Sequence, residues 1–188
     1  VGFVKAYVLA LWFLPFALMP NTNIHELSYS ELLISIYAFY FYLYFNFSGY
    51  CDVMIGIGSL FGVRPPENFN KPFMARNISD FWQRQHRSLT LWLTDYVFSP
   101  IYKKSLTSDN IFAHPIIAIN VSLLITMIVS GFWHGTTLAF LFFGITHGMF
   151  LVVYHNWNTW LTHKIGRKQT KQLRQNPLVH AGGIFLTF

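Results

Sequence analysis

The sequence predicts an all-α protein whose helices form a bundle across a membrane, and three properties of the chain indicate this. Of the 188 residues, 53% are hydrophobic and only 11% are charged, whereas a soluble domain carries about 25% charged residues. The mean hydropathy is +0.38. Phenylalanine and tyrosine are abundant, with 20 and 10 copies, which suits the aromatic belts that membrane proteins place at both interfaces.

Four apolar segments approach the roughly 20 residues that a helix needs to cross hydrocarbon. They cover residues 4–19, 32–47, 115–133 and 137–154. Pro15 is expected to kink the first segment, and residues 178–188 have the composition of a fifth. Because the chain starts with Val1 and stops inside that apolar run, we expect a piece of a longer protein in which residues 1–188 form a single membrane-embedded domain.

The region between the second and third segments is mixed, and three parts can be distinguished. Residues 53–63 are apolar but short and glycine-rich, which favours a re-entrant or short buried helix over a span. Residues 64–77 contain two adjacent prolines and are expected to form an ordered loop buried in protein. Residues 78–102, with Ser79 as N-cap, are predicted to form an amphipathic helix lying in the membrane interface. Its apolar stripe consists of residues three or four apart, namely Trp82, His86, Leu89, Leu93 and Tyr96.

Lysine and arginine gather in two stretches, residues 64–104 and 163–174, while the loop at 20–30 contains neither. If each of the four segments crosses once, both basic stretches lie on one side of the membrane and the turn at His134 lies on the other. The positive-inside rule makes the basic side cytoplasmic. The net charge of +6 therefore reflects topology rather than nucleic-acid binding, and we expect a multi-pass membrane protein.

Two histidines stand out because of their apolar surroundings. His134 directly follows the uncharged run 115–133. An imidazole in or near hydrocarbon is costly to keep and by default indicates a functional site, because it can exchange a proton near neutral pH. His86 lies in the apolar stripe of the amphipathic segment, and taken alone it is better interpreted as a buried, hydrogen-bonded structural histidine.

His147 lies about ten residues into the fourth segment, on the order of 15 Å along a helix axis and so near mid-membrane. It is expected either to form an interhelical hydrogen bond to Ser, Thr or Asn or to take part in the site. Gly144 and Gly148 form a GxxxG pattern around it, which lets another helix approach closely.

Motifs for several other chemistries are missing from the sequence. It contains no nucleophile elbow, no phosphate-binding loop, no HExxH zinc motif and no cysteine pair, and the single Cys51 is expected to be a packed residue. His86, His134 and His147 lack the spacing of metal ligands, so we expect no metal site. Two hypotheses remain open, general-base chemistry on a bound hydroxyl group and proton-coupled transport through the membrane.

Five short motifs, taken together, resemble the membrane-bound O-acyltransferase family. They are YFNFSGYCD at 44–52, ENFNKPF at 67–73, DFWQRQHRSLTLWLTDY at 80–96, GFWHG at 131–135 and THG at 146–148. They occur in the family's order and cover about residues 44–155. They look most like the family's bacterial branch, which includes the membrane subunits that acetylate alginate and D-alanylate teichoic acid.

The resemblance implies a multi-helix fold with a tunnel through a buried core, and it implies roles for particular residues. His134, in the Trp-His-Gly motif, would be the principal catalytic residue, and His86 the second important position. Gln85 departs from the tryptophan that is common before this second histidine. Substrate-binding or supporting roles would fall to Asn70, Arg84, Asp95, Trp133 and His147.

The function implied by the resemblance is transfer of an acyl group, expected to be acetyl, from a cytoplasmic thioester donor to a hydroxyl of an exported polysaccharide or cell-envelope glycan. The donor would be acetyl-CoA or an acylated carrier protein, with no tightly bound cofactor. Expected partners are the bilayer and a periplasmic acetyltransferase, a relay protein or a small carrier protein. The alternatives are D-alanyl transfer from a carrier protein to teichoic acid and, in another class, a proton-coupled transporter without transfer chemistry.

Overall fold

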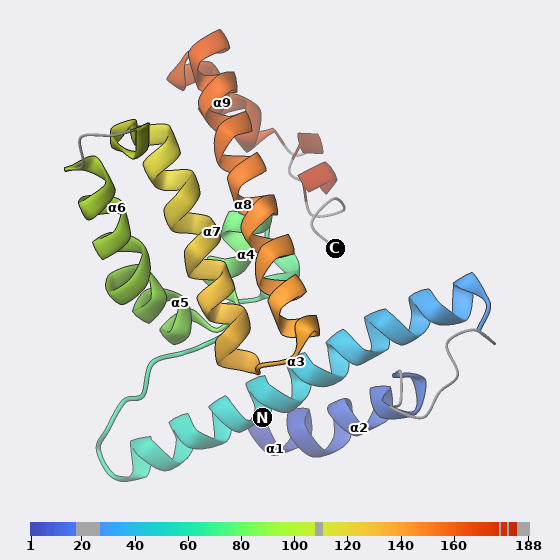
Figure 1. The fold of residues 1–188 in the computed structure, drawn as a ribbon. Coiled ribbons are helices and arrows are strands. Elements are labelled where there is room, and N and C mark those ends of the chain that lie inside the picture. Colours follow the sequence, from blue (N-terminus) through green and yellow to red (C-terminus); the bar gives the residue numbers. More distant parts are fainter. Residues whose placement is uncertain (18–26, 108–110, 177, 180, 184–188) are drawn as a thin grey trace. The chain divides into compact units, whose positions relative to one another are not determined.

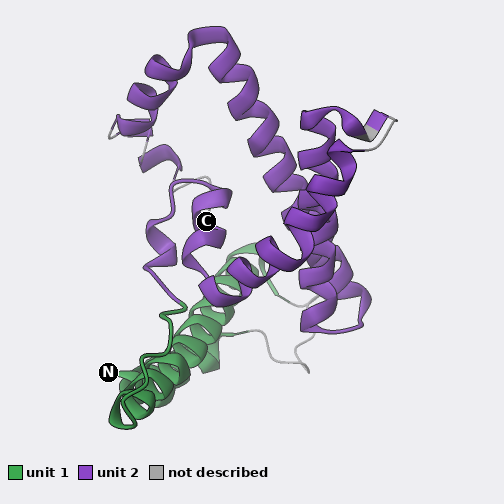
Figure 2. Cartoon of the chain, turned by 90° about the vertical axis from the view of Figure 1, so that its left-hand side faces the viewer, with its two compact units in different colours: residues 1–68 green, residues 69–188 purple. Residues whose placement is uncertain are grey.

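A computed structural model describes residues 1–17, 27–107, 111–176, 178–179 and 181–183, and every regular element among them is a helix. The predicted all-α class is therefore confirmed. The chain divides into two compact units, residues 1–68 and 69–188 (Figure 2). The loop expected at 20–30 lies mostly outside the described residues, as does most of the fifth segment expected at 178–188.

The first unit opens with a helical stretch that ends one residue after Pro15. Its consecutive pieces are α1 (Gly2–Val4), the π-helix η1 (Lys5–Leu9), α2 (Ala10–Phe13) and the 3₁₀-helix η2 (Leu14–Phe16). Ala17 is extended, with φ −74° and ψ 150°. The predicted kink at Pro15 is thus a helix end, because proline lacks the N–H that an α-helix needs to continue.

The long helix α3 (Tyr29–Leu60) begins with a capping box between Ser28 and Glu31. It continues for 32 residues, about 48 Å at 1.5 Å per residue, which exceeds the hydrocarbon thickness. The separate short helix predicted over residues 53–63 is wrong, since α3 runs through to Leu60. Glycine weakens a helix by only about 1 kcal/mol. In an apolar setting a helix still pairs the backbone N–H and C=O groups better than an irregular chain does.

Small residues bring the first helical stretch and α3 close together. A Cβ atom on Gly49 would lie 2.7 Å from the carbonyl oxygen of Gly2, so only glycine permits this approach. Farther along, the ring of Phe13 stacks on that of Phe41 at 5.1 Å. An ion pair of 2.8 Å joins Lys5 to Asp52 between the same helices.

The second unit is built on the adjacent helices α7 (Pro115–His134) and α8 (Leu138–Ile165), which a short turn connects (Figure 1). A Cβ on Gly144 would lie 2.5 Å from the carbonyl oxygen of Met127, and one on Gly148 would lie 2.9 Å from Leu124. The GxxxG prediction is therefore confirmed. Helix α8 extends to Ile165 rather than ending at residue 154.

The segment 78–102 does not form the single amphipathic helix that its stripe predicted. It is divided into α4 (Ile78–Arg84), α5 (Arg87–Leu93), the π-helix η5 (Thr94–Phe98) and α6 (Ser99–Leu106). The N-cap is Asn77 rather than Ser79, since the Asn77 side chain accepts a hydrogen bond from the Asp80 N–H. Of the stripe, Trp82, Leu89 and Leu93 are buried, but Tyr96 is 69% exposed.

Three helices in the described part of the chain are long and apolar enough to cross a membrane, and these are α3, α7 and α8. The first helical stretch is apolar but shorter. A 3₁₀-helix, η4 (Pro72–Met74), precedes α4, and η6 (Ile111–Ala113) precedes α7. The basic helix α9 (Arg167–Gln175) follows α8 after a turn at Gly166.

Candidate active site

His86 owes its position to the break between α4 and α5. Gln85 is extended, and His86 has the left-handed values φ 46° and ψ 54°, a conformation that non-glycine residues adopt rarely and often at functional sites. Thr90 secures this turn, because its hydroxyl donates a 2.9 Å hydrogen bond to the carbonyl of Trp82 on the other side of the break. Its backbone N–H also donates to the carbonyl of His86. The imidazole of His86 lies edge-on to the indole of Trp133, 5.6 Å between ring centroids.

His134 is the last residue of α7 and is surrounded by aromatic rings. The rings of Trp133 and His134 are 4.8 Å apart. From α8, Phe140 stacks on His134 at 5.9 Å and Phe143 meets it edge-on at 5.5 Å. His134 itself is exposed on the surface of the described chain.

His147 lies deeper than His134, one turn further along α8 from Phe143. Its ring lies 4.5 Å from that of Phe143 and 5.4 Å from that of Trp82. Its Nδ1 atom is buried and accepts or donates no hydrogen bond among the described residues. The interhelical hydrogen bond to Ser, Thr or Asn is therefore not made at this atom.

These contacts form one continuous set of rings, which we call the ring cluster. Its members are His86, Trp133, His134, Phe143, His147 and Trp82. The structure thus brings together the three histidines of the motifs from three separate elements. Sequence reasoning missed Phe143, although its spacing of four from His147 places both residues on one face of a helix.

Asn70 and Arg84 also meet, through the Asn70 backbone and through both the backbone and the side chain of Arg84. The N–H of Asn70 donates to the carbonyl of Arg84 at 2.9 Å, and an Arg84 guanidinium nitrogen donates to the carbonyl of Asn70 at 3.2 Å. Arg84 also forms a 2.7 Å ion pair with Asp80. This brace fixes the end of α4 immediately before the break that carries His86.

Asp95 is not part of this arrangement. It lies on η5 and is exposed, and within the described chain it forms no ion pair or hydrogen bond with the ring cluster. Over the same residues, no group of three or more His, Cys, Asp and Glu side chains is placed to hold a metal ion.

Burial lowers the pKa of His86. A backbone hydrogen bond of the same residue partly offsets this effect, and the charge of nearby His134 lowers the pKa further. His86 is therefore neutral at pH 7, with one ring nitrogen able to donate a hydrogen bond and the other able to accept one. The ring cluster consequently presents imidazole groups in an apolar setting, which suits proton transfer to or from a bound hydroxyl group.

The helical fold and the histidine site define an integral membrane protein, and sequence comparison gives its family. The profile of the MBOAT, membrane-bound O-acyltransferase family matches residues 2–173. The chain belongs to this family, as its five motifs predicted.

The relatives include proteins of three kinds. A teichoic acid D-alanyltransferase from Streptococcus thermophilus is 35% identical over 196 residues, covering 100% of this chain and 47% of that protein. A peptidoglycan O-acetyltransferase from Helicobacter pylori is 35% identical over 154 residues, covering 82% of this chain and 28% of that protein. A probable alginate O-acetylase AlgI from Pseudomonas aeruginosa is 37% identical over 111 residues, covering 59% of this chain and 20% of that protein. The chain thus spans about half the length of the relatives that match it end to end.

Proposed function

We propose that the protein is an O-acyltransferase in which His134 acts as general base. The observation that carries this proposal is that His86 and His134, from separate elements, both lie against the ring of Trp133. Family membership supports the reaction class, and the exposure of His134 leaves room for a hydroxyl group beside its imidazole.

The proposed reaction transfers an acyl group from a thioester to an alcohol. The acceptor oxygen attacks the thioester carbonyl carbon while the imidazole of His134 removes the hydroxyl proton. The C–S bond then breaks, an ester forms, and the imidazolium of His134 returns its proton to the leaving thiolate. Neutral His86 donates a hydrogen bond to the carbonyl oxygen as negative charge develops there, or orients the donor.

The remaining residues of the site would position the catalytic groups and the substrate, and would not transfer protons. Trp133 separates the imidazoles of His86 and His134 and fixes their orientation. His147 packs against Phe143. Asn70 and Arg84 hold the end of α4 in place. Asp95, which is exposed on η5, would bind substrate, as the family resemblance implies.

The acceptor is proposed to be a hydroxyl of an exported polysaccharide or cell-envelope glycan, since the named relatives act on teichoic acid, peptidoglycan and alginate. Acetyl transfer from acetyl-CoA or an acylated carrier is the first candidate. We further propose that residues 1–188 belong to a single catalytic domain in a bacterial inner membrane, working with a periplasmic or relay acetyltransferase.

D-alanyl transfer is a second candidate, and one observation favours it. The relatives aligned over the whole of this chain, from Streptococcus thermophilus and Bacillus subtilis, are both named teichoic acid D-alanyltransferases. In that case the donor would be a D-alanyl thioester on a small carrier protein docking on the cytoplasmic face.

The experiment that tests the proposal uses the full-length protein in detergent with a labelled acyl thioester and a glycan acceptor. An acyltransferase consumes the thioester and places the label on the acceptor without a membrane gradient. Acetyl and D-alanyl thioesters, tested in parallel, separate the two candidates. Label movement that requires sealed vesicles and a proton gradient, with the thioester intact, would instead identify a transporter.

A further inference from the structure

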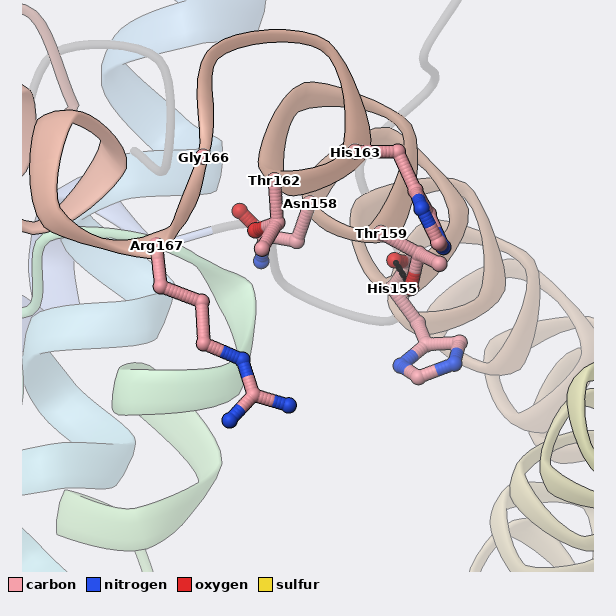
Figure 3. A pocket seen from close by; sticks show the side chains of 7 residues that line it. All are labelled: His155, Asn158, Thr159, Thr162, His163, Gly166 and Arg167. Atoms are coloured by element: carbon pink, nitrogen blue, oxygen red, sulfur yellow. Dashed lines mark hydrogen bonds between the residues drawn. The ribbon is translucent and has the colours of Figure 1, made fainter.

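A polar cavity of about 610 Å³ lies at the corner between α8 and α9, at the end of α8 that lies away from His134. It is lined by His155, Asn158, Thr159, Thr162, His163, Gly166 and Arg167. Figure 3 shows the Arg167 side chain on one side of the open space and the rings of His155 and His163 on the other, with Asn158 and Thr162 between them. The corner depends on Gly166, whose φ of 81° suits glycine.

The charged side chains of the cavity lining and of α9 are all basic. After residue 111 the sequence contains no Asp or Glu, and its basic residues, histidines aside, are Lys164, Arg167, Lys168, Lys171 and Arg174. The ion pairs of the described chain lie elsewhere, at Lys5–Asp52 and Arg84–Asp80. Arg174 reaches the cavity lining by donating a hydrogen bond to the side-chain oxygen of Asn158. A cluster of cations that forms no ion pair with the described residues, in a concave site, favours an anionic ligand.

Two tryptophans beside the cavity indicate its depth in the membrane. Trp157 and Trp160 lie on the same end of α8, with ring centroids 5.0 Å apart, and are 57% and 48% exposed. The ammonium group of Lys164 lies 4.9 Å from the Trp160 ring. Exposed tryptophans at the end of a membrane-spanning helix sit at the headgroup level, so the cavity opens where lipid headgroups are found.

We propose that this cavity binds the phosphate headgroup of an anionic phospholipid. The guanidinium of Arg167 is suited to two parallel hydrogen bonds to phosphate oxygens. The hydroxyl of Thr162 adds a donor from α8, and α9 begins at Arg167 of the lining, where a helix N-terminus favours an anion. Basic pockets next to membrane-spanning helices recognise lipid headgroups by the same chemistry. Soluble phosphates share it, but the exposed tryptophans favour the lipid.

The test measures lipid bound to the full-length protein. The protein is purified in detergent, incubated with equal amounts of phosphatidylglycerol and phosphatidylcholine, and analysed by native mass spectrometry. Wild type is expected to retain phosphatidylglycerol selectively. Arg167→Gln should lower that retention roughly tenfold, because hydrogen bonds between charged partners are the strong ones. Lys103→Gln, which removes one positive charge on α6 instead, is the matched control and should retain lipid as wild type does.

A second variant and a soluble ligand complete the design. Thr162→Val preserves every charge and should still weaken phosphatidylglycerol retention, so the test does not depend on whether Arg167→Gln folds. Binding of inorganic phosphate and of coenzyme A is measured by calorimetry on the same proteins. The proposal is overturned if both cavity variants retain phosphatidylglycerol as well as Lys103→Gln does, or if only the soluble phosphates bind in an Arg167-dependent manner.

Discussion

At the scale of single residues, the site depends on imidazoles held between aromatic rings. His86 has the left-handed conformation that a β-branched residue would not tolerate, and its ring is directed to Trp133. The rings that contact His134 belong to Trp133 on the same helix and to Phe143 on α8. The three imidazoles lie on one connected set of rings, although they are separated by up to about sixty positions in the sequence.

The lowered pKa of His86 gives a pH prediction. Its folded-state pKa lies below the ordinary value of about 6.5 because burial disfavours the charged form. The stability that neutral His86 contributes is therefore present above pH 6.5 and is lost as pH falls through the folded-state pKa. Proton uptake by His86, followed by NMR on labelled full-length protein, should have its midpoint below that of an unfolded peptide containing the same residues.

His86→Asn provides the comparison, since it keeps a hydrogen-bond donor and tolerates a left-handed backbone. We expect this variant to keep more transfer activity than His86→Ala, which should lose about 10²-fold if the donated hydrogen bond stabilises the developing oxyanion. Equal activities of the two variants would remove His86 from that role.

At the scale of helices, the membrane-spanning segments could be predicted from the sequence, but the break between α4 and α5 could not. Uncharged apolar runs predict α7 and the start of α8 closely. A single segment that crosses hydrocarbon must pair its own backbone N–H and C=O groups, and over this length a helix is the conformation that does so. The stripe from Trp82 to Tyr96 gave the correct buried residues on α4 and α5. It missed the break at His86, because a turn secured by one threonine hydroxyl leaves the apolar spacing almost unchanged.

The break can be tested through Thr90. Thr90→Val keeps the shape of the side chain but removes the hydrogen bond to Trp82, which is worth about 1 kcal/mol. We expect transfer activity to fall several-fold while the folded protein remains, measured as turnover and as thermal unfolding. Thr94→Val is the control, because its hydroxyl bonds only to the carbonyl of Thr90 one turn back in the same helical stretch and it is exposed.

Close packing of α7 and α8 gives a second prediction at this scale. Gly144→Ala would place a Cβ atom 2.5 Å from the carbonyl oxygen of Met127, and overpacking costs about 1–3 kcal/mol. Gly56→Ala in α3 is a matched control, since among the described residues no atom outside its own helix lies within 4 Å of the added Cβ. Thermal unfolding in detergent should show a lower midpoint for the first variant and an equal or higher one for the second. Equal loss in both would argue against the close helix contact.

At the scale of the whole molecule, the placement of charge predicts topology. Helices α7 and α8 form an antiparallel pair with a short turn, so the beginning of α7 and the end of α8 lie at the same end of the pair. The basic residues before α7 and after α8 therefore share a side, as the positive-inside rule requires. The cavity at the α8–α9 corner could not be predicted from the sequence, because its lining depends on where the chain turns at Gly166.

Cysteine labelling in membrane vesicles measures this topology. In a Cys51→Ser background, Lys104→Cys and Lys168→Cys should react with an impermeant maleimide from the same, cytoplasmic side. Thr136→Cys, in the turn after His134, should react only from the opposite side. Labelling of all three from one side would show that α7 and α8 do not cross.

The central claim is that the imidazole of His134 removes the acceptor proton during acyl transfer, and one measurement addresses it directly. Transfer from a labelled thioester to the glycan is timed for full-length wild type, His134→Ala and the control His114→Gln, whose side chain caps no helix end and makes no contact with the ring cluster. We predict that His134→Ala remains folded and loses at least about 10²-fold in rate, the usual range for a general base, while His114→Gln is unchanged. A folded His134→Ala protein that transfers at the wild-type rate would contradict the account.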